Sequence, residues 1–253
     1  MADERSIGVF DSGVGGIGTL AALMRELPQE RFLFYGDTAN APYGTKSRED
    51  CMGCIERVVE RLLAEDVKAI VIACNTATAV AAKELRARHA LPIIGIEPAL
   101  KPAHELRRSG SILVLATPMT LRLEKFQALY ERYGEGAIPL PCPGLMELVE
   151  REDDAAAREY LLRLLAPYDL NTVDAIVLGC THYVFLRPIL ADILPATVQV
   201  LDGNAGTARQ LRRVLSERGL LAQGEGSVTL ETSGDPETVL PVMRRLLERA
   251  GAW

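Results

Sequence analysis

The chain has 253 residues, 48% of them hydrophobic and 25% charged, which is enough to bury the core of one large domain or two small ones. Its formal net charge is −6 and it has no basic stripe, so we expect no nucleic-acid partner. It begins without a signal-peptide run, and no apolar stretch approaches a membrane span. We therefore expect a cytoplasmic protein with no membrane partner, in which the five cysteines are reduced thiols.

Short β-rich runs alternate with longer helical patterns along the whole chain. Strands are predicted at residues 6–10, 31–36, 69–73, 92–96, 111–116, 136–140, 175–179, 197–201 and 227–232. Helices are predicted between them, at Thr19–Leu27, Ser47–Glu65, Thr76–His89, Leu121–Tyr133, Ala155–Ala166, Phe185–Leu194, Thr207–Arg218 and Pro236–Ala250. Several strand runs are apolar throughout, which is typical of parallel strands buried on both faces. The alternation predicts an α/β fold with mostly parallel sheets flanked by helices.

An internal sequence repeat, called the echo below, divides the chain into two similar parts. The run Ser6-Ile-Gly-Val-Phe returns 105 residues later as Ser111-Ile-Leu-Val-Leu, and Ala69-Ile-Val-Ile-Ala-Cys74 returns 106 residues later as Ala175-Ile-Val-Leu-Gly-Cys180. Strands of Val, Ile and Ala resemble each other by chance, but both copies of the second run end in a scarce cysteine. We therefore predict two similar, pseudo-symmetric α/β domains. The first comprises residues 1–97 plus 208–253, so that the last segment packs back onto it, and the second comprises residues 98–207.

The two cysteines of this echo are candidate acid/base groups. Cys74 precedes Asn75-Thr76, and Cys180 precedes Thr181-His182, so each thiol follows a strand and precedes a predicted helix start. Ligands of open α/β sheets bind beyond the carboxyl ends of the strands, and a helix N-terminus lowers the pKa of a thiol. Two such domains would face a shared cleft, where one thiol removes an α-proton and the other returns a proton to the opposite face.

Other interpretations of the cysteines remain open. Either thiol alone can be a small buried hydrophobe. A metal site of Cys74, Cys180 and His182 lacks a fourth ligand and the usual zinc spacing, so no metal is predicted. Cys51 and Cys54 form a CxxC inside a helical pattern, where both share a face and packing is the favoured interpretation. Cys142 is interpreted as structural.

A glycine-rich loop follows the first strand and supports a rival function. Its glycines fit the dinucleotide fingerprint G-x-G-x-x-G: Gly13, Gly15 and Gly18. Asp37 follows 19 residues later, where a ribose carboxylate would lie, so a nicotinamide-dependent oxidoreductase is one alternative. Asp11 argues against it, because a carboxylate just before the glycines would repel a pyrophosphate. The loop and Ser12 can instead hold a smaller anion, and a non-catalytic amino-acid-binding protein is a third alternative.

Several motifs together resemble the bacterial glutamate racemase family. They follow the family's order across nearly the whole chain: Asp11-Ser-Gly-Val-Gly-Gly, Tyr35-Gly-Asp-Thr-Ala-Asn-Ala-Pro-Tyr-Gly44, Ala73-Cys-Asn-Thr-Ala77, Leu178-Gly-Cys-Thr-His-Tyr183 and Ser233-Gly-Asp-Pro236. The resemblance implies a cofactor-independent interconversion of L- and D-glutamate that supplies D-glutamate for peptidoglycan. It also implies two α/β domains with the active site between them, and a homodimer.

The resemblance also implies residue roles. Cys74 is the acid/base group toward D-glutamate and Cys180 toward L-glutamate. Asp11, Asp37, Glu150 and His182 match residues with supporting roles. From the chemistry of the residues we add the hypothesis that His182 tunes Cys180 and that Asp11 tunes Cys74. The substrate-contacting residues matched by motif are Asp11, Ser12, Tyr43, Gly44, Asn75, Thr76, Thr181 and His182, and a loop with Thr117 and Thr120 lies near the site.

The chain departs from the family pattern in three places. The stretch Cys142-Pro-Gly-Leu-Met-Glu-Leu-Val-Glu150 is looser than in the family, so Glu147 is a second candidate for the role of Glu150. Val184 stands where proline is common. The short leader before Ser6 lacks the extension of members activated by a cell-wall precursor, so we expect no such activation. The interpretation of His182 as a helix-cap or packing residue with no catalytic role also stays open.

Overall fold

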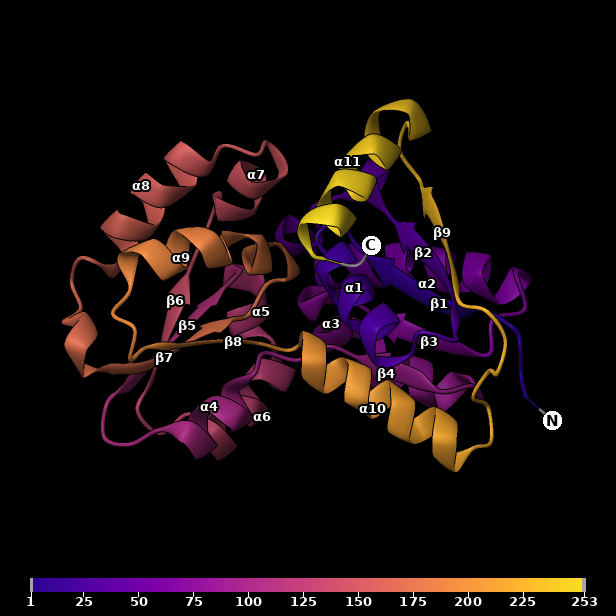
Figure 1. Cartoon of the computed structure of the whole chain (residues 1–253), viewed down its shortest axis with the longest axis horizontal. Coiled ribbons are helices and arrows are strands. Elements are labelled where there is room, and N and C mark those ends of the chain that lie inside the picture. The colour runs from indigo at the N-terminus through magenta and orange to yellow at the C-terminus, as the bar shows by residue number, and fades with distance from the viewer. Residues whose placement is uncertain (1, 252–253) are drawn as a thin grey trace. The chain divides into compact units, whose positions relative to one another are not determined.

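A computed structural model of the chain describes residues 2–251. The chain forms two compact units, each built on its own parallel sheet (Figure 1). Unit 1 comprises Met1–Glu97 and Asn204–Trp253, and unit 2 comprises Pro98–Gly203. The predicted α/β class, with two parallel sheets flanked by helices, is confirmed. Within the described residues, no helix is both long enough and apolar enough to cross a membrane.

Unit 1 contains a five-stranded parallel sheet within the described residues, in the order β4-β3-β1-β2-β9. Its strands are β1 (Ile7–Asp11), β2 (Arg31–Gly36), β3 (Ala69–Ile72), β4 (Ile93–Gly95) and β9 (Ser227–Thr232). The central strands β1 and β3 are buried along their whole length, as their continuous apolar runs predict. The last strand, β9, pairs with β2, so the end of the chain completes the sheet of unit 1.

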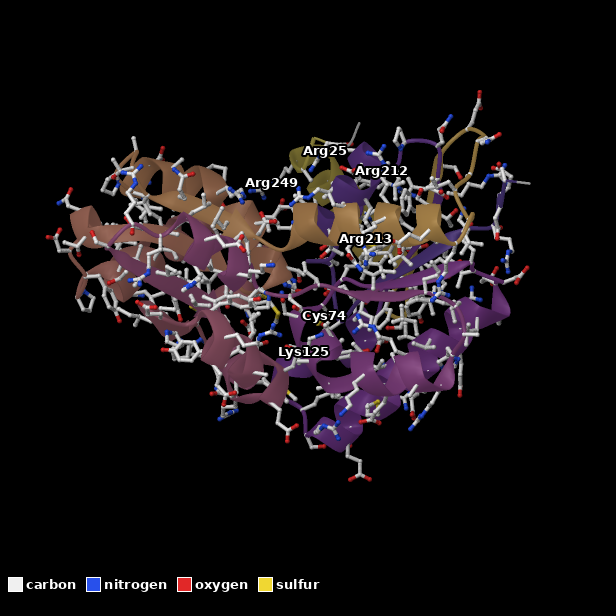
Figure 2. The ribbon with its side chains drawn as sticks, turned by 90° about the horizontal axis from the view of Figure 1, so that it is seen from below. Arg25, Cys74, Lys125, Arg212, Arg213 and Arg249 are labelled. Atoms are coloured by element: carbon white, nitrogen blue, oxygen red, sulfur yellow. The ribbon has the colours of Figure 1, made fainter. Side chains whose placement is uncertain are left out.

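Helices cover both faces of this sheet. On one face, α1 (Ile17–Glu26) packs against α10 (Asn204–Glu217) and α11 (Pro236–Arg249), and on the other α2 (Arg48–Ala64) packs against α3 (Asn75–Arg88) (Figure 1). Arginines tie the carboxyl-terminal helices to α1 (Figure 2). Arg212 of α10 forms an ion pair with Glu26 at 3.1 Å, and Arg25 donates to the carbonyl of Ala250 at 2.7 Å.

Unit 2 contains a four-stranded parallel sheet in the order β6-β5-β7-β8. Its strands are β5 (Ser111–Ala116), β6 (Ala137–Pro141), β7 (Val173–Leu178) and β8 (Gln199–Asp202). The helices α4 (Leu100–Leu106), α5 (Pro118–Arg122) and α6 (Glu124–Tyr133) cover one face, and α7 (Leu145–Glu150), α8 (Asp154–Leu165) and α9 (Arg187–Ile193) the other (Figure 1). Buried side chains such as Ile112, Phe126 and Val177 form the core beneath the first group.

The two sheets repeat one topology. In unit 1 the chain moves from β1 outward to β2 and then returns to the other side of β1 with β3 and β4. In unit 2 it moves from β5 to β6 and returns with β7 and β8. The strand order therefore reverses between β1 and β3 and between β5 and β7. In open α/β sheets, ligands bind outside the carboxyl ends of the strands at such a switch point.

Helix boundaries differ from the prediction in unit 2. The predicted helix Leu121–Tyr133 is two helices, because the chain is extended at Leu123, with φ −74° and ψ 140°. The predicted helix Phe185–Leu194 begins earlier, as a 3-10 helix over Thr181–Leu186 that α9 continues. The short helices α4 and α7 were not predicted, because each is too brief to show a helical period.

Candidate functional site

The predicted residues of unit 1 gather where β1 and β3 end. Asp11 is the last residue of β1 and Ser12 follows it, while Cys74 and Asn75 follow β3. The backbone joins these two ends, because the N–H of Ala73 donates to the carbonyl of Phe10 at 2.7 Å. All four side chains are buried. They therefore occupy the switch point of this sheet, the position at which α/β folds bind ligands.

Cys74 is the N-cap of α3 (Figure 2). Its Sγ accepts a hydrogen bond from the N–H of Ala77 at 3.4 Å and lies 3.6 Å from Oγ of Ser12. The thiol thus faces the amino-terminal end of a 14-residue helix, whose dipole favours a negative charge there. A hydroxyl and a backbone donor are placed to stabilise a thiolate.

The pKa of Cys74 departs from the prediction. Burial raises the pKa of this thiol, and the carboxylate of Asp11 raises it further. The bonds from Ala77 and Ser12 act in the opposite direction but do not outweigh burial. The expectation of a pKa lowered by the helix start is therefore wrong, because local sequence does not reveal how deeply a thiol is buried.

The carboxylate of Asp11 occupies a backbone donor of the glycine loop that a dinucleotide phosphate would need. Its Oδ2 accepts from the N–H of Gly13 at 3.0 Å, so the carboxylate occupies the donor that would meet a phosphate. Gly16 serves packing, because a Cβ there would lie 2.6 Å from Cβ of Asp11 and 3.0 Å from Cβ of Ala73. The glycines allow a close turn around Asp11, and the nicotinamide alternative loses its main structural support.

Tyr43 and Asp37 form a buried pair beside this edge. The hydroxyl of Tyr43 donates to Oδ2 of Asp37 at 2.6 Å, and Nδ2 of Asn40 donates to Oδ1 at 2.9 Å. The N–H of Asp37 donates to the carbonyl of Asp11 at 3.0 Å, which ties the segment to the end of β1. Burial raises the pKa of Tyr43, and the bond to Asp37 adds to this, so Tyr43 is a neutral donor. Gly44 follows it, half-buried.

Asn75 holds an unsatisfied acceptor. Its side chain is 6% exposed, and Oδ1 has no hydrogen-bond partner among the described residues. A buried polar atom without a partner costs free energy, which a bound ligand can recover by supplying a donor. Thr76, the next residue of the first helical turn, is also buried. The start of α3 therefore has the character of a polar ligand site.

In unit 2 the predicted residues form a chain of three side chains. Sγ of Cys180 lies 3.8 Å from Nδ1 of His182, and Nε2 of His182 lies 2.9 Å from Oε1 of Glu150. Cys180 and His182 are buried, and Glu150 is one-third exposed. Glu150 is the last residue of α7, and Cys180 follows β7. Of the two candidate carboxylates, Glu150 is the one that contacts His182.

These contacts favour the imidazolium form of His182. Burial opposes an imidazolium, but the bonds to Cys180 and Glu150 outweigh it and hold the pKa of His182 well above 6.5. Burial raises the pKa of Glu150, but the bond to His182 and the charge of His182 together lower it by more, so the net effect is a lowering. An imidazolium between a thiol and a carboxylate can donate from both ring nitrogens. The interpretation of His182 as a packing residue therefore leaves its two polar contacts unexplained.

The remaining predicted residues of unit 2 lie near the same strand ends. Thr117 follows β5 and caps α5, accepting from the N–H of Thr120 at 3.2 Å, and the two hydroxyls are 2.9 Å apart. Thr181 is buried beside Cys180. Tyr183 belongs to the same motif as Cys180, and its hydroxyl donates to the carbonyl of Cys142 at 3.1 Å. That bond fixes the segment leading into α7, and so the approach of Glu150.

The other cysteines are buried thiols. Cys51 and Cys54 lie on the buried side of α2, as the packing interpretation predicts. Burial raises the pKa of Cys51 and of Cys142 to about 12, so both are protonated at neutral pH. Within residues 2–251, no three His, Cys, Asp or Glu side chains are grouped closely enough to hold a metal ion.

The chain is similar to known racemases over nearly its whole length. Residues 17–211 match the sequence model of the Asp/Glu/Hydantoin racemase family. The chain is 45% identical to the glutamate racemase of Bifidobacterium adolescentis, over 98% of this chain and 100% of that protein. Its fold is similar to the crystal structure of Thermus thermophilus glutamate racemase, with a TM-score of 0.85 and 37% identity over 98% of this chain and 95% of the other. A Francisella tularensis glutamate racemase, solved in complex with D-glutamate, has a TM-score of 0.83 and 28% identity, over 97% of this chain and 94% of the other.

Proposed function

The chain belongs to the glutamate racemases of the Asp/Glu/hydantoin racemase family, and on that premise we propose that it interconverts L- and D-glutamate with Cys74 and Cys180 as its two acid/base groups. One observation carries the residue assignment. Each sheet places one buried cysteine after the second strand of its switch point, with polar partners beside the sulfur. One thiolate removes the α-proton, and the thiol on the other face returns a proton.

On the Cys74 side, the helix start and Ser12 support the thiolate. Because burial and Asp11 raise the pKa of Cys74, this group is a thiol at neutral pH and is ready to give a proton. For the reverse direction it must act as a thiolate, and a substrate ammonium near Asp11 would offset the charge that opposes this. We assign the proton of D-glutamate to Cys74, in keeping with its match to the family motif.

On the Cys180 side, His182 and Glu150 support the thiolate by charge. The imidazolium faces Sγ through Nδ1, and Glu150 stabilises the imidazolium through Nε2. A thiolate next to an imidazolium has the form that abstracts a proton. We assign the proton of L-glutamate to Cys180, with His182 and Glu150 as the groups that tune it.

Glutamate presents two carboxylates and one ammonium, and the polar groups described above suit them. Backbone N–H groups at the start of α3 and the hydroxyls of Ser12, Thr76 and Thr181 suit carboxylates. The neutral hydroxyl of Tyr43 and the backbone of Gly44 are further candidates. The buried acceptor Oδ1 of Asn75 and the carboxylate of Asp11 suit the ammonium. The hydroxyl of Thr117, after β5 of unit 2, is a further candidate.

The activity is tested by purified protein and D-glutamate in deuterated water, with no added cofactor. We expect racemisation with deuterium incorporated at Cα. Binding of an amino acid without exchange would instead favour the non-catalytic alternative. Turnover that requires a nicotinamide would restore the oxidoreductase, which the family membership and the Asp11–Gly13 bond both argue against.

The Glu150–His182 pair predicts an asymmetric pH dependence. Glu150 has a lowered pKa, so its charge is present above about 4.5 and is lost as pH falls through the lowered value. His182 has a raised pKa, so its charge is present below 6.5 and is lost as pH rises through the raised value. Replacing Glu150 with Gln removes the carboxylate and lowers the pKa of His182. We expect kcat/KM for L-glutamate to fall roughly tenfold or more, and its high-pH limb to move to lower pH.

Proton NMR of the imidazole rings measures the same change directly, because the chain has only three histidines. The signals of His89 and His104 serve as internal references. Glu147→Gln on the same helix is the matched control and should leave the pH profile unchanged. A Glu147→Gln profile that shifts while the Glu150→Gln profile does not would transfer the role to Glu147.

Finer properties are proposed from the family. We infer a cytoplasmic homodimer whose D-glutamate enters peptidoglycan, and the likeness to glutamate racemases supports this. Sedimentation equilibrium at micromolar protein should give twice the mass of 27.6 kDa. A monomer mass across that range would contradict the dimer without bearing on racemisation.

A further inference from the structure

The carboxyl end of β9 holds the segment that follows β2. Oγ1 of Thr232 lies 2.7 Å from Oγ1 of Thr38, and Oγ of Ser233 accepts from the N–H of Ala39 at 3.0 Å. The N–H of Ser233 donates to the carbonyl of Gly36 at 3.1 Å. Three bonds therefore join two segments that are almost 200 residues apart in the sequence.

The geometry of this contact is specific. The N–H of Gly234 donates to Oγ1 of Thr232 at 3.1 Å, and in the bond between Thr232 and Thr38 either hydroxyl can be the donor. A Cβ on Gly234 would lie 2.4 Å from Oγ1 of Thr38, so glycine is required for the approach. Asp235 then caps α11, accepting from the N–H of Glu237 at 3.1 Å, and anchors the segment on a long helix.

The held segment leads to two proposed substrate-binding residues. From Thr38 the chain passes through two short 3-10 helices, Thr38–Asn40 and Tyr43–Thr45. Asp37 fixes one side of the segment by its bond to Tyr43, and β9 fixes the other. The position of Tyr43 and Gly44 is thus set jointly by the carboxylate of Asp37 and by the hydroxyls of Thr232 and Ser233.

We propose that Thr232 and Ser233 are positioning residues for substrate binding: they hold residues 38–44 where Tyr43 and Gly44 can contact glutamate. This inference rests on the proposed function. Without the two hydroxyls, the segment populates other positions, and the apparent affinity falls by the fraction that stays competent. At saturating glutamate the competent position is refilled, so turnover is kept.

The test compares Thr232→Val and Ser233→Ala with wild type. We expect KM to rise about fivefold to tenfold for each, which corresponds to the loss of one intramolecular hydrogen bond. The factor should be the same for L- and D-glutamate, with kcat within about twofold of wild type. Ser233→Thr keeps the hydroxyl and should restore KM. Thr229→Val is the matched control, since Thr229 is exposed on the same strand and the same hydroxyl is lost.

Several outcomes overturn the proposal. One is a KM equal to that of Thr229→Val, and another is a fall in kcat at unchanged KM. A lower melting temperature with unchanged kinetics would show that the contact only stabilises the fold. Calorimetric dissociation constants for D-glutamate should rise by the same factor as KM. If Ser233→Ala does not fold, Thr232→Val and Ser233→Thr decide. A wild type without racemisation would sink the proposed function instead.

Discussion

Replacing either Cys74 or Cys180 with alanine is expected to lower glutamate racemisation by roughly 10³-fold or more in both directions. Racemisation needs a proton acceptor on one face of Cα and a donor on the other, and each variant lacks one of them. Loss in both directions is required, since a group that acts as base in one direction acts as acid in the other. Polarimetry or a coupled assay for D-glutamate measures the change.

Isotope exchange separates a missing base from a damaged fold. Cys74→Ala retains Cys180, so in deuterated water it should exchange the α-proton of L-glutamate without inverting it. Cys180→Ala should do the same with D-glutamate. Cys51→Ala is the matched control, because it also removes a buried thiol but lies on the packed side of α2. If either Cys74→Ala or Cys180→Ala turned over like Cys51→Ala, the two-base scheme would be wrong.

The strands and the site edges were predictable for one physical reason. Parallel strands buried on both faces require unbroken apolar runs, such as 69–73, so the polar residues that end them stand out. Cys74 and Cys180 are visible in this way, and the repeat of their surroundings is a property of sequence alone. The sequence does not show to the same degree which distant residues each strand end contacts.

Three features depend on packing between distant segments. The raised pKa of Cys74 comes from burial, which the helix start alone does not report. The contact of Glu150 with His182 requires the short helix α7, which has no detectable period. The bonds from β9 to Thr38 join segments whose pairing depends on the order of strands in the sheet. Local sequence identified the residues of the site, and tertiary structure decided their partners and charges.

A buried ion pair at the amino-terminal ends of β2 and β3, away from the candidate site, should have a large effect on stability. Nζ of Lys68 lies 2.6 Å from Oε2 of Glu30, and both side chains are almost fully buried. Lys68 also donates to the carbonyls of Asp3 and Leu220, and Glu30 accepts from the N–H of Ala222 at 2.9 Å. The pair lies just before β2 and β3. Because its hydrogen bonds reach Asp3 on one side and residues 220–222 on the other, it joins the amino-terminal segment to the loop that leads to β9.

Replacing Glu30 with alanine is expected to lower the free energy of unfolding by about 3–5 kcal/mol, because it leaves the charge of Lys68 buried without a counter-ion. Urea unfolding measures the loss. The double variant Glu30→Leu with Lys68→Met removes both charges and should regain much of it, since apolar pairs often replace buried ion pairs without cost. Glu217→Ala is the control: its pair with Arg213 is more than half exposed and should contribute under about 1 kcal/mol.

Activity adds a second readout to this prediction. The pair lies at the amino-terminal ends of β2 and β3, whereas Asp11 and Cys74 lie at the carboxyl ends of their strands, so the folded fraction of Glu30→Ala should keep near-normal kcat. A double variant no more stable than Glu30→Ala would mean that the bonds of Lys68 to the two carbonyls, rather than its charge, dominate. Unchanged stability in Glu30→Ala would mean that water reaches Lys68 and that the pair is not sealed in the core.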